Sequence, residues 1–236
     1  MIKIKLYLVF SLVFCTLINA QNQAVELLQK SSDTVDKLTN YSVSLTMKTI
    51  AGGLDGELIE TTDGMYKKSA DNSYSELGSL IAIQQPQKAI VIDKENNNII
   101  ITEKPSAKDK NTFLEIYKQL IPFVDTVYTT YNNDSSAYVV CKYKKVFGVF
   151  YDRIEMLLNK KSYLPEKILM YTLSANSMYD DEFAGRNIVL TIDYKNWILN
   201  ASLPSNLFDF NNYAYKNGEQ WLPAKKFENF EVTIMN

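Results

Sequence analysis

The fold is decided by residues 187–210, which read "NIVLTIDYKNWILNASLPSNLFDF". Apolar side chains stand at every second position from Ile188 to Tyr194, which is typical of a half-buried β-strand. Pro204 then favours a turn, and Phe208 and Phe210 follow one residue apart. This stretch therefore predicts a long strand, a proline-bearing turn and a closing aromatic segment.

The rest of the chain predicts an α+β protein. Residues 22–39 have helical apolar spacing with a polar interruption at Ser31 and Ser32, and residues 113–121 form a second, short helix that Pro122 ends. Between and after them lie about ten short, alternating strands, with turns predicted at 63–64, 71–72 and 94–98. The expected architecture is one domain, residues 21–236: a large curved antiparallel sheet forming an incomplete β-barrel, covered by the two helices.

The first twenty residues indicate a secretory signal peptide. Lys3 and Lys5 precede a twelve-residue apolar run, residues 6–17, that is short for a membrane span. Ala20 supplies a small residue before the expected cleavage site, so the mature protein is predicted to be periplasmic. Cys15 leaves a second interpretation open, a lipid-anchored protein, but the bulky Phe14 stands where lipoprotein signals need a small residue.

Composition excludes several classes of function. The net charge is −2, and removal of Lys3 and Lys5 with the signal changes it to −4. A weakly acidic chain with scattered lysines lacks the basic surface that nucleic-acid binding requires, so no nucleic-acid partner is expected. Cys141 is the single cysteine of the mature chain and is predicted to be a buried small hydrophobe. The protein is expected to be a monomer.

No catalytic or metal-binding constellation stands out. The chain has no histidine, which removes the usual general base and the usual zinc ligand. The acidic run from Asp180 to Glu182 allows three interpretations: a Ca²⁺ site, paired carboxylates of a hydrolase, or a solvated loop, which is preferred. The two arginines, Arg153 and Arg186, are expected at the surface or at strand ends. No catalytic residue, metal or cofactor is predicted.

Two late segments carry a resemblance to a known superfamily. Residues 158–174, "LNKKSYLPEKILMYTLS", and residues 187–210 resemble the P-x-K-I hairpin and the closing strand of LolA-like periplasmic lipoprotein carriers. The resemblance implies an incomplete barrel with a helical plug, a hydrophobic cavity for acyl chains, and Phe208 and Phe210 packed back against the sheet. Residues 56–68 depart from the family pattern because they contain no arginine, and "MYKK" stands at residues 65–68.

The resemblance implies a non-enzymatic carrier or binder of lipid or lipoprotein acyl chains. Its partners would be the acylated cargo and the sorting components of the inner and outer membranes. The alternative is an envelope scaffold or sensor of the same fold that binds a protein. The candidate cavity residues are one parity of the long strands, although the opposite parity also carries apolar side chains. The plentiful aromatic side chains could line such a cavity or belong to the core of the sheet. The candidate cavity residues are Val43, Leu45, Met47, Ile154, Met156, Leu158, Ile168, Met170, Ile188, Leu190 and Ile192.

Overall fold

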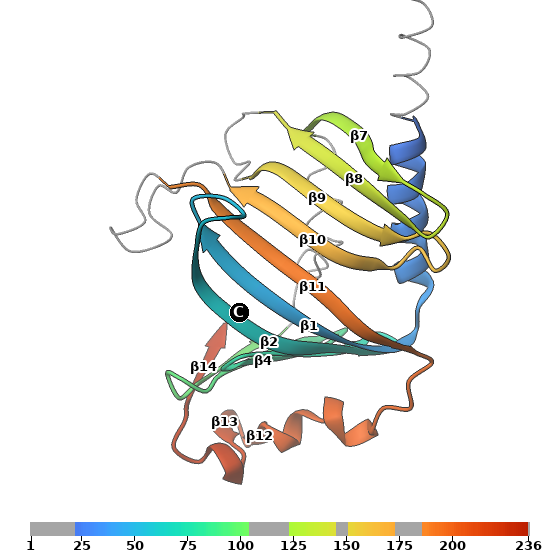
Figure 1. Ribbon diagram of the computed structural model, residues 1–236. Helices are drawn as coiled ribbons and strands as arrows, with labels where there is room; N and C mark the ends of the chain where they lie inside the picture. The colour runs from blue at the N-terminus through green and yellow to red at the C-terminus, as the bar shows by residue number, and fades with distance from the viewer. Residues whose placement is uncertain (1–21, 104–122, 145–150, 173–185, 236) are drawn as a thin grey trace, which may run out of the picture. The chain divides into compact units, whose positions relative to one another are not determined.

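A computed structural model describes residues 22–103, 123–144, 151–172 and 186–235 (Figure 1). Twelve of its strands form one sheet in the order β14-β6-β5-β4-β3-β2-β1-β11-β10-β9-β8-β7, and β12 and β13 form a separate pair. The registers within β2–β6 and within β7–β11 are antiparallel, whereas β14 runs parallel to β6. The strands are β1 (Asn40–Ala51), β2 (Glu57–Ser69), β3 (Asn72–Leu77), β4 (Leu80–Gln85), β5 (Lys88–Asp93), β6 (Asn98–Glu103), β7 (Val124–Asn132), β8 (Ser136–Tyr143), β9 (Tyr151–Asn159), β10 (Pro165–Thr172), β11 (Ile188–Leu199), β12 (Ala214–Asn217), β13 (Gln220–Pro223) and β14 (Glu231–Met235).

The predicted α+β class and its large, unclosed sheet are confirmed. A helix over residues 22–37 precedes the strands, and β14 and β7 end the strand order with one neighbour each. Three short 3₁₀ turns follow β11: η4 (Ser205–Phe208), η5 (Phe210–Asn212) and η6 (Lys225–Phe227). The signal peptide and the predicted helix at 113–121 lie outside the described residues.

The described residues divide into two compact units. The first contains residues 22–37, 48–60, 123–144, 151–172 and 186–193, and the second contains residues 38–47, 61–103 and 194–235. β1, β2 and β11 contribute residues to both units, whereas β7–β10 belong to the first and β3–β6 to the second.

In the first unit the helix buries one face. Its buried residues are spaced by three and four positions, as a single helical stripe requires. They are Ala24, Leu27, Leu28, Ser31, Ser32 and Val35. Ser31 and Ser32, which look like a polar interruption in the sequence, therefore belong to the buried stripe. The helix also contacts the β9–β10 turn, because the ammonium of Lys30 lies 5.4 Å from the ring centre of Tyr163.

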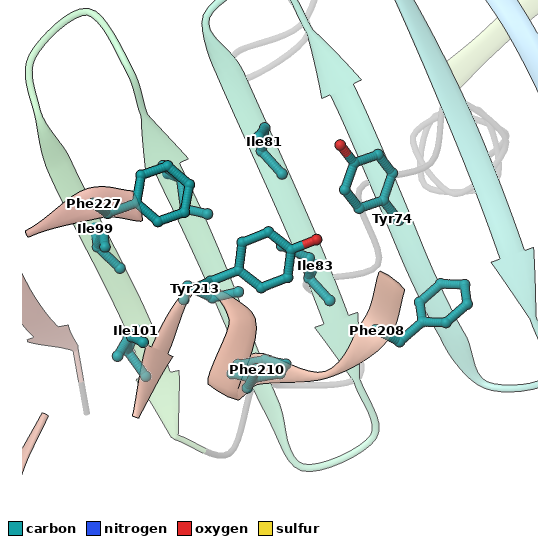
Figure 2. Close-up of a cluster of buried hydrophobic side chains, with 12 residues drawn as sticks. Tyr74, Ile81, Ile83, Ile99, Ile101, Phe208, Phe210, Tyr213 and Phe227 are labelled. Atoms are coloured by element: carbon teal, nitrogen blue, oxygen red, sulfur yellow. The ribbon is translucent and has the colours of Figure 1, made fainter. Parts of the chain in front are cut away.

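In the second unit the fold depends on a stripe of isoleucines on β4, β5 and β6 (Figure 2). The register pairs Ile83 with Ile90 and Ile90 with Ile101, so their side chains lie side by side on one face. A second row pairs Ile81 with Ile92 and continues to Ile99. All six are at most 6% exposed.

The segment after β11 covers this isoleucine face. Phe208 and Phe210 are 6% and 3% exposed and join the same hydrophobic cluster, together with Tyr213 and Phe227. Figure 2 shows these rings lying over the strands that carry the isoleucines. Gln85 donates a hydrogen bond of 2.8 Å to the carbonyl of Phe208, which fixes the cover to β4. The predicted packing of the two phenylalanines against the sheet is confirmed.

One predicted turn is wrong. The turn expected at Asp63 and Gly64 is absent from the described residues, because β2 continues through both positions to Ser69. Gly64 lies so close to β3 that an added Cβ would stand 2.4 Å from the carbonyl oxygen of Glu76. The glycine therefore marks a close approach of two strands, whereas the turn predicted at 71–72 and the β5–β6 turn are present.

The cover can be tested through one buried ring. We expect Phe210→Ala to lower the free energy of unfolding by about 3–5 kcal/mol, because it removes a buried ring and leaves a cavity. Tyr215→Ala is the matched control: this ring lies in the same segment but is 42% exposed, so its loss should change the free energy by about 0.5 kcal/mol or less. Urea denaturation measures both, and equal losses would contradict the covering role.

Candidate functional site

Four aromatic rings form a continuous row in the second unit. Tyr66 of β2 lies 5.7 Å from Tyr41 of β1, Tyr41 lies 5.5 Å from Trp197 of β11, and Trp197 lies 5.9 Å from Tyr194, all measured between ring centres. Such spacings are those of interacting aromatic pairs. We call these four residues the aromatic row.

The backbone of Asn196 makes the row possible. In a regular strand, residues 194 and 197 would point to opposite faces because the side-chain period is two. Asn196 has φ 54°, the left-handed conformation that asparagine tolerates better than most residues. This irregularity shifts the alternation, and the rings of Tyr194 and Trp197 stack with an interplanar angle of 23°.

The row continues into a strip of short side chains. The registers pair Tyr66 with Ser75, Ser75 with Ala82, Ala82 with Val91, and Val91 with Ile100. These residues therefore share one face of β2–β6, the face opposite the isoleucines. Ser75, Ala82, Val91 and Ile100 are all half-buried, so this face presents apolar surface that is only partly covered.

Three candidate cavity residues of β1 belong to the same face. Val43, Leu45 and Met47 have the parity of Tyr41, and β1 has no positive φ that would interrupt its alternation before Met47. Val43 is 2% exposed, whereas Leu45 and Met47 are half-buried. We call this surface the aromatic face; it comprises the aromatic row, the strip Ser75–Ala82–Val91–Ile100, and Val43, Leu45 and Met47.

Burial determines the electrostatics of the row. It raises the pKa of the Tyr194 hydroxyl well above its ordinary value, and no opposing interaction lowers it. The pKa of Tyr66 is also raised by burial, while hydrogen bonds with Ser73 and Tyr41 act in the opposite direction. Both hydroxyls are therefore neutral at physiological pH, and the face offers apolar and hydrogen-bonding contacts without a charge from these rings.

The remaining candidate residues lie in the first unit. The register pairs Met156 with Ile168 and Ile168 with Ile192, and it likewise pairs Ile154 with Met170 and Met170 with Leu190. The predicted parity therefore does bring these side chains to one face of β9–β11. Leu190 and Ile192 are half-buried, and the others are at most 6% exposed and form core. The latter are Ile154, Met156, Leu158, Ile168, Met170 and Ile188.

Sequence reasoning missed a charged cluster on the other face of these strands. Arg153 Nε lies 2.8 Å from Glu155 Oε1, without the alignment of a hydrogen bond, and its guanidinium stacks 3.9 Å from the ring centre of Tyr171. Tyr138 donates a hydrogen bond to Glu155, which is only 9% exposed. Burial and this bond raise the pKa of Tyr138.

Arg153, which was expected at the surface or at a strand end, is the third residue of β9 and is half-buried, paired with the buried carboxylate of Glu155. Arg186 is exposed and paired with Glu57 at 2.9 Å, as expected of a surface charge. Cys141 is fully buried, as predicted.

Other candidate chemistry falls outside or is not found in the described residues. Asp180 to Glu182 and Cys15 lie outside them. Among the residues with assigned positions, no group of three or more His, Cys, Asp or Glu side chains is placed to hold a metal ion. None of the helices in that part of the chain is both long and apolar enough to cross a membrane.

Comparison with known proteins gives structural likeness at low identity. No family model matches the sequence, and no curated protein matches it. An uncharacterized conserved protein from Thermus thermophilus is 9% identical with a TM-score of 0.49, covering 90% of this chain and 99% of that one. A LolA superfamily protein from Nitrosomonas europaea is 13% identical with a TM-score of 0.34, covering 79% and 97%.

A third match is the MucA/MucB complex of Pseudomonas aeruginosa, 10% identical with a TM-score of 0.40, covering 76% of this chain and 60% of the matched chain. The superfamily that the sequence resembles is thus named among the solved structures that match. At these identities and TM-scores, the matches assign no activity to this chain.

The role of Asn196 can be tested by substitution. We expect Asn196→Val to lower the free energy of unfolding by about 1–2 kcal/mol, because a β-branched residue is strained at this φ. Asn196→Gly should keep both the stability and the near-ultraviolet circular dichroism of the stacked rings, because glycine adopts this conformation freely. Lys195→Val, at the exposed neighbouring position, is the control; a loss as large there would show that β-branching alone is responsible.

Proposed function

We propose that this protein binds an acyl chain on the aromatic face and acts without catalysis, as a carrier or binder of lipid or lipoprotein in the periplasm. The observation that supports this proposal is that a row of four adjoining aromatic rings and a half-buried, mostly aliphatic strip lie on one sheet face. The LolA-like resemblance of the sequence points to the same class of ligand.

Physical chemistry favours such a ligand. Ala82, Val91 and Ile100 offer neither a charge nor a side-chain hydrogen-bonding group, so a polar ligand would find no partner for its own polar groups along these three residues. An alkyl chain gains about 0.8 kcal/mol for each methylene that leaves water. About ten methylenes would therefore supply roughly 8 kcal/mol, the order of a micromolar dissociation constant. Half-buried Met47 adds an adaptable contact.

A protein partner is the second candidate function. Among the described residues, β7 and β14 end the sheet with one neighbouring strand each. The edge of such a strand can add an extended segment of another chain through backbone hydrogen bonds. Deleting the C-terminal residues after Asn212 looks like a simple test of protein binding, but it would not separate this function from acyl-chain binding. The deletion takes Tyr213 and Phe227 out of the hydrophobic cluster that covers the isoleucines.

The two tryptophans allow a sharp test of the acyl-chain proposal. Trp197 belongs to the aromatic row, whereas Trp221 donates a hydrogen bond of 3.1 Å to Glu103 and packs against the isoleucine cluster on the opposite face. Trp221→Phe leaves Trp197 as the only tryptophan, and Trp197→Phe leaves Trp221. A brominated fatty acid should quench the fluorescence of the first variant in a saturable manner and leave the second nearly unchanged.

A third variant places a charge on the face. Met47→Lys in the Trp221→Phe background should weaken the quenching by about tenfold or more, because an ammonium beside a buried alkyl chain loses its water without gaining a partner. Lys48→Met, one residue further on the strand, is the matched control. Absence of quenching in both single-tryptophan proteins would exclude acyl-chain binding here and leave the protein-partner function in the lead.

A further inference from the structure

Three lysines from distant parts of the sequence gather at the margin of the isoleucine cluster. Lys67 lies on β2, Lys94 in the β5–β6 turn, and Lys226 on η6 of the covering segment. Lys67 lies over the ring of Tyr74, and Lys94 pairs with Glu76, both on β3. Lys226 lies over Tyr213, which belongs to the same hydrophobic cluster as Tyr74. The register pairs Lys67 with Tyr74, so Lys67 is on the covered face of the sheet, opposite the aromatic face.

One lysine is already neutralised. The ammonium of Lys94 lies 2.7 Å from Glu76 Oε1, and the hydroxyl of Tyr74 donates a hydrogen bond of 2.8 Å to Glu76 Oε2. These bonds, with the charges of Lys94 and Lys67, hold the pKa of Glu76 below its ordinary value. The Lys94–Glu76 pair is therefore fully formed at neutral pH and contributes no net charge.

The other two lysines contact rings instead of carboxylates. Lys67 Nζ lies 5.7 Å from the ring centre of Tyr74, and Lys226 Nζ lies 4.3 Å from that of Tyr213 and 4.8 Å from that of Phe227. Within the residues that the structure describes, neither ammonium has a carboxylate at ion-pair distance. Lys67 and Lys226 together therefore contribute a charge of +2 at this place, in a protein whose net charge is −2.

The surroundings of Lys226 disfavour its charged form and lower its pKa. Burial against the rings lowers its pKa first, and the like charge of Lys94 lowers it further, with only Glu76 acting in the opposite direction. A bound anion would relieve both effects, because it would supply hydrogen-bond acceptors to the ammonium groups and compensate their repulsion.

We propose that Lys67 and Lys226, with Lys94 beside them, bind a phosphate monoester group at the margin of the covered face. A phosphate monoester carries a charge of about −1.5 to −2 and three acceptor oxygens, which matches two unpaired ammonium groups. A phosphate-monoester lipid headgroup and inorganic phosphate present the same charged phosphate oxygens, so either could occupy the site. This site is separate from the aromatic face, so its failure would leave the acyl-chain proposal untouched.

Isothermal titration calorimetry of the purified protein with inorganic phosphate tests the site, with sodium chloride of equal ionic strength as the reference titration. We expect saturable binding by the unchanged protein and a loss of about tenfold or more in Lys226→Gln, because a charge-assisted hydrogen bond is removed. Lys67→Gln should act in the same direction. Lys225→Gln is the matched control, since Lys225 is the exposed neighbour on the same 3₁₀ turn.

Vesicles distinguish the two sources of the group. Cosedimentation with phosphatidylcholine vesicles that contain phosphatidic acid, compared with phosphatidylcholine alone, would assign the site to a lipid headgroup if only the first bind and Lys226→Gln releases them. Binding of inorganic phosphate without vesicle binding would assign it to a soluble phosphate. No saturable phosphate binding and no phosphatidic-acid dependence, or equal effects of Lys225→Gln and Lys226→Gln, would overturn the proposal.

Discussion

The second unit depends on one constraint, the need to cover six isoleucines on a single face of β4, β5 and β6. Alternation in a strand sends every second side chain to the same side, and the registers place these isoleucines in two adjoining rows. If that face were exposed to water, the fold would lose the hydrophobic stabilisation that burial of the six isoleucines provides. The chain after β11 therefore returns across the sheet, and its phenylalanines complete the core.

The direction of β14 follows from the same cover. A hairpin would have added the last strand antiparallel, but a parallel strand requires a long connection. The covering segment provides that connection: it runs across the isoleucine face, and after Phe227 the amide of Glu231 donates a hydrogen bond to the carbonyl of Asn97. β14 then pairs with β6 from Asn98 onward. The parallel pairing of β14 with β6 is thus a consequence of how the core is closed.

Strand alternation made most of this architecture predictable, because it depends on local spacing alone. The N-terminal helix, β7–β11 and the β5–β6 turn follow from periodicity, and the packing of Phe208 and Phe210 follows from the resemblance. The errors have a common cause, which is tertiary context. Gly64 looks like a turn residue until the approach of β3 is known, and Ser31 looks like a break in a stripe that small side chains allow to pack closely.

The candidate site was only partly predictable for a related reason. Strand alternation places Val43, Leu45 and Met47 on one face, but the aromatic row depends on the left-handed backbone of Asn196, which moves Trp197 onto the face of Tyr194. In the sequence, the signal for this irregularity is Asn196 within an otherwise regular strand. Its presence does not reveal which of the following side chains change to the other face of the sheet. The pairing of Arg153 with Glu155 was missed because the carboxylate lies two residues away in an apolar strand, where it gives no periodic signal.

The two proposed sites are physically independent because the sheet separates them. Tyr66 and Lys67 are consecutive residues of β2, so one points to the aromatic face and the other to the covered face. An amphiphile with its alkyl chain along Val91 and Ile100 cannot reach Lys226 without passing around an edge of the sheet, since paired strands leave no gap between their backbones. If one lipid did occupy both sites, substitutions on the two faces would be coupled; on this geometry, we expect the effects of Met47→Lys and Lys226→Gln to be additive.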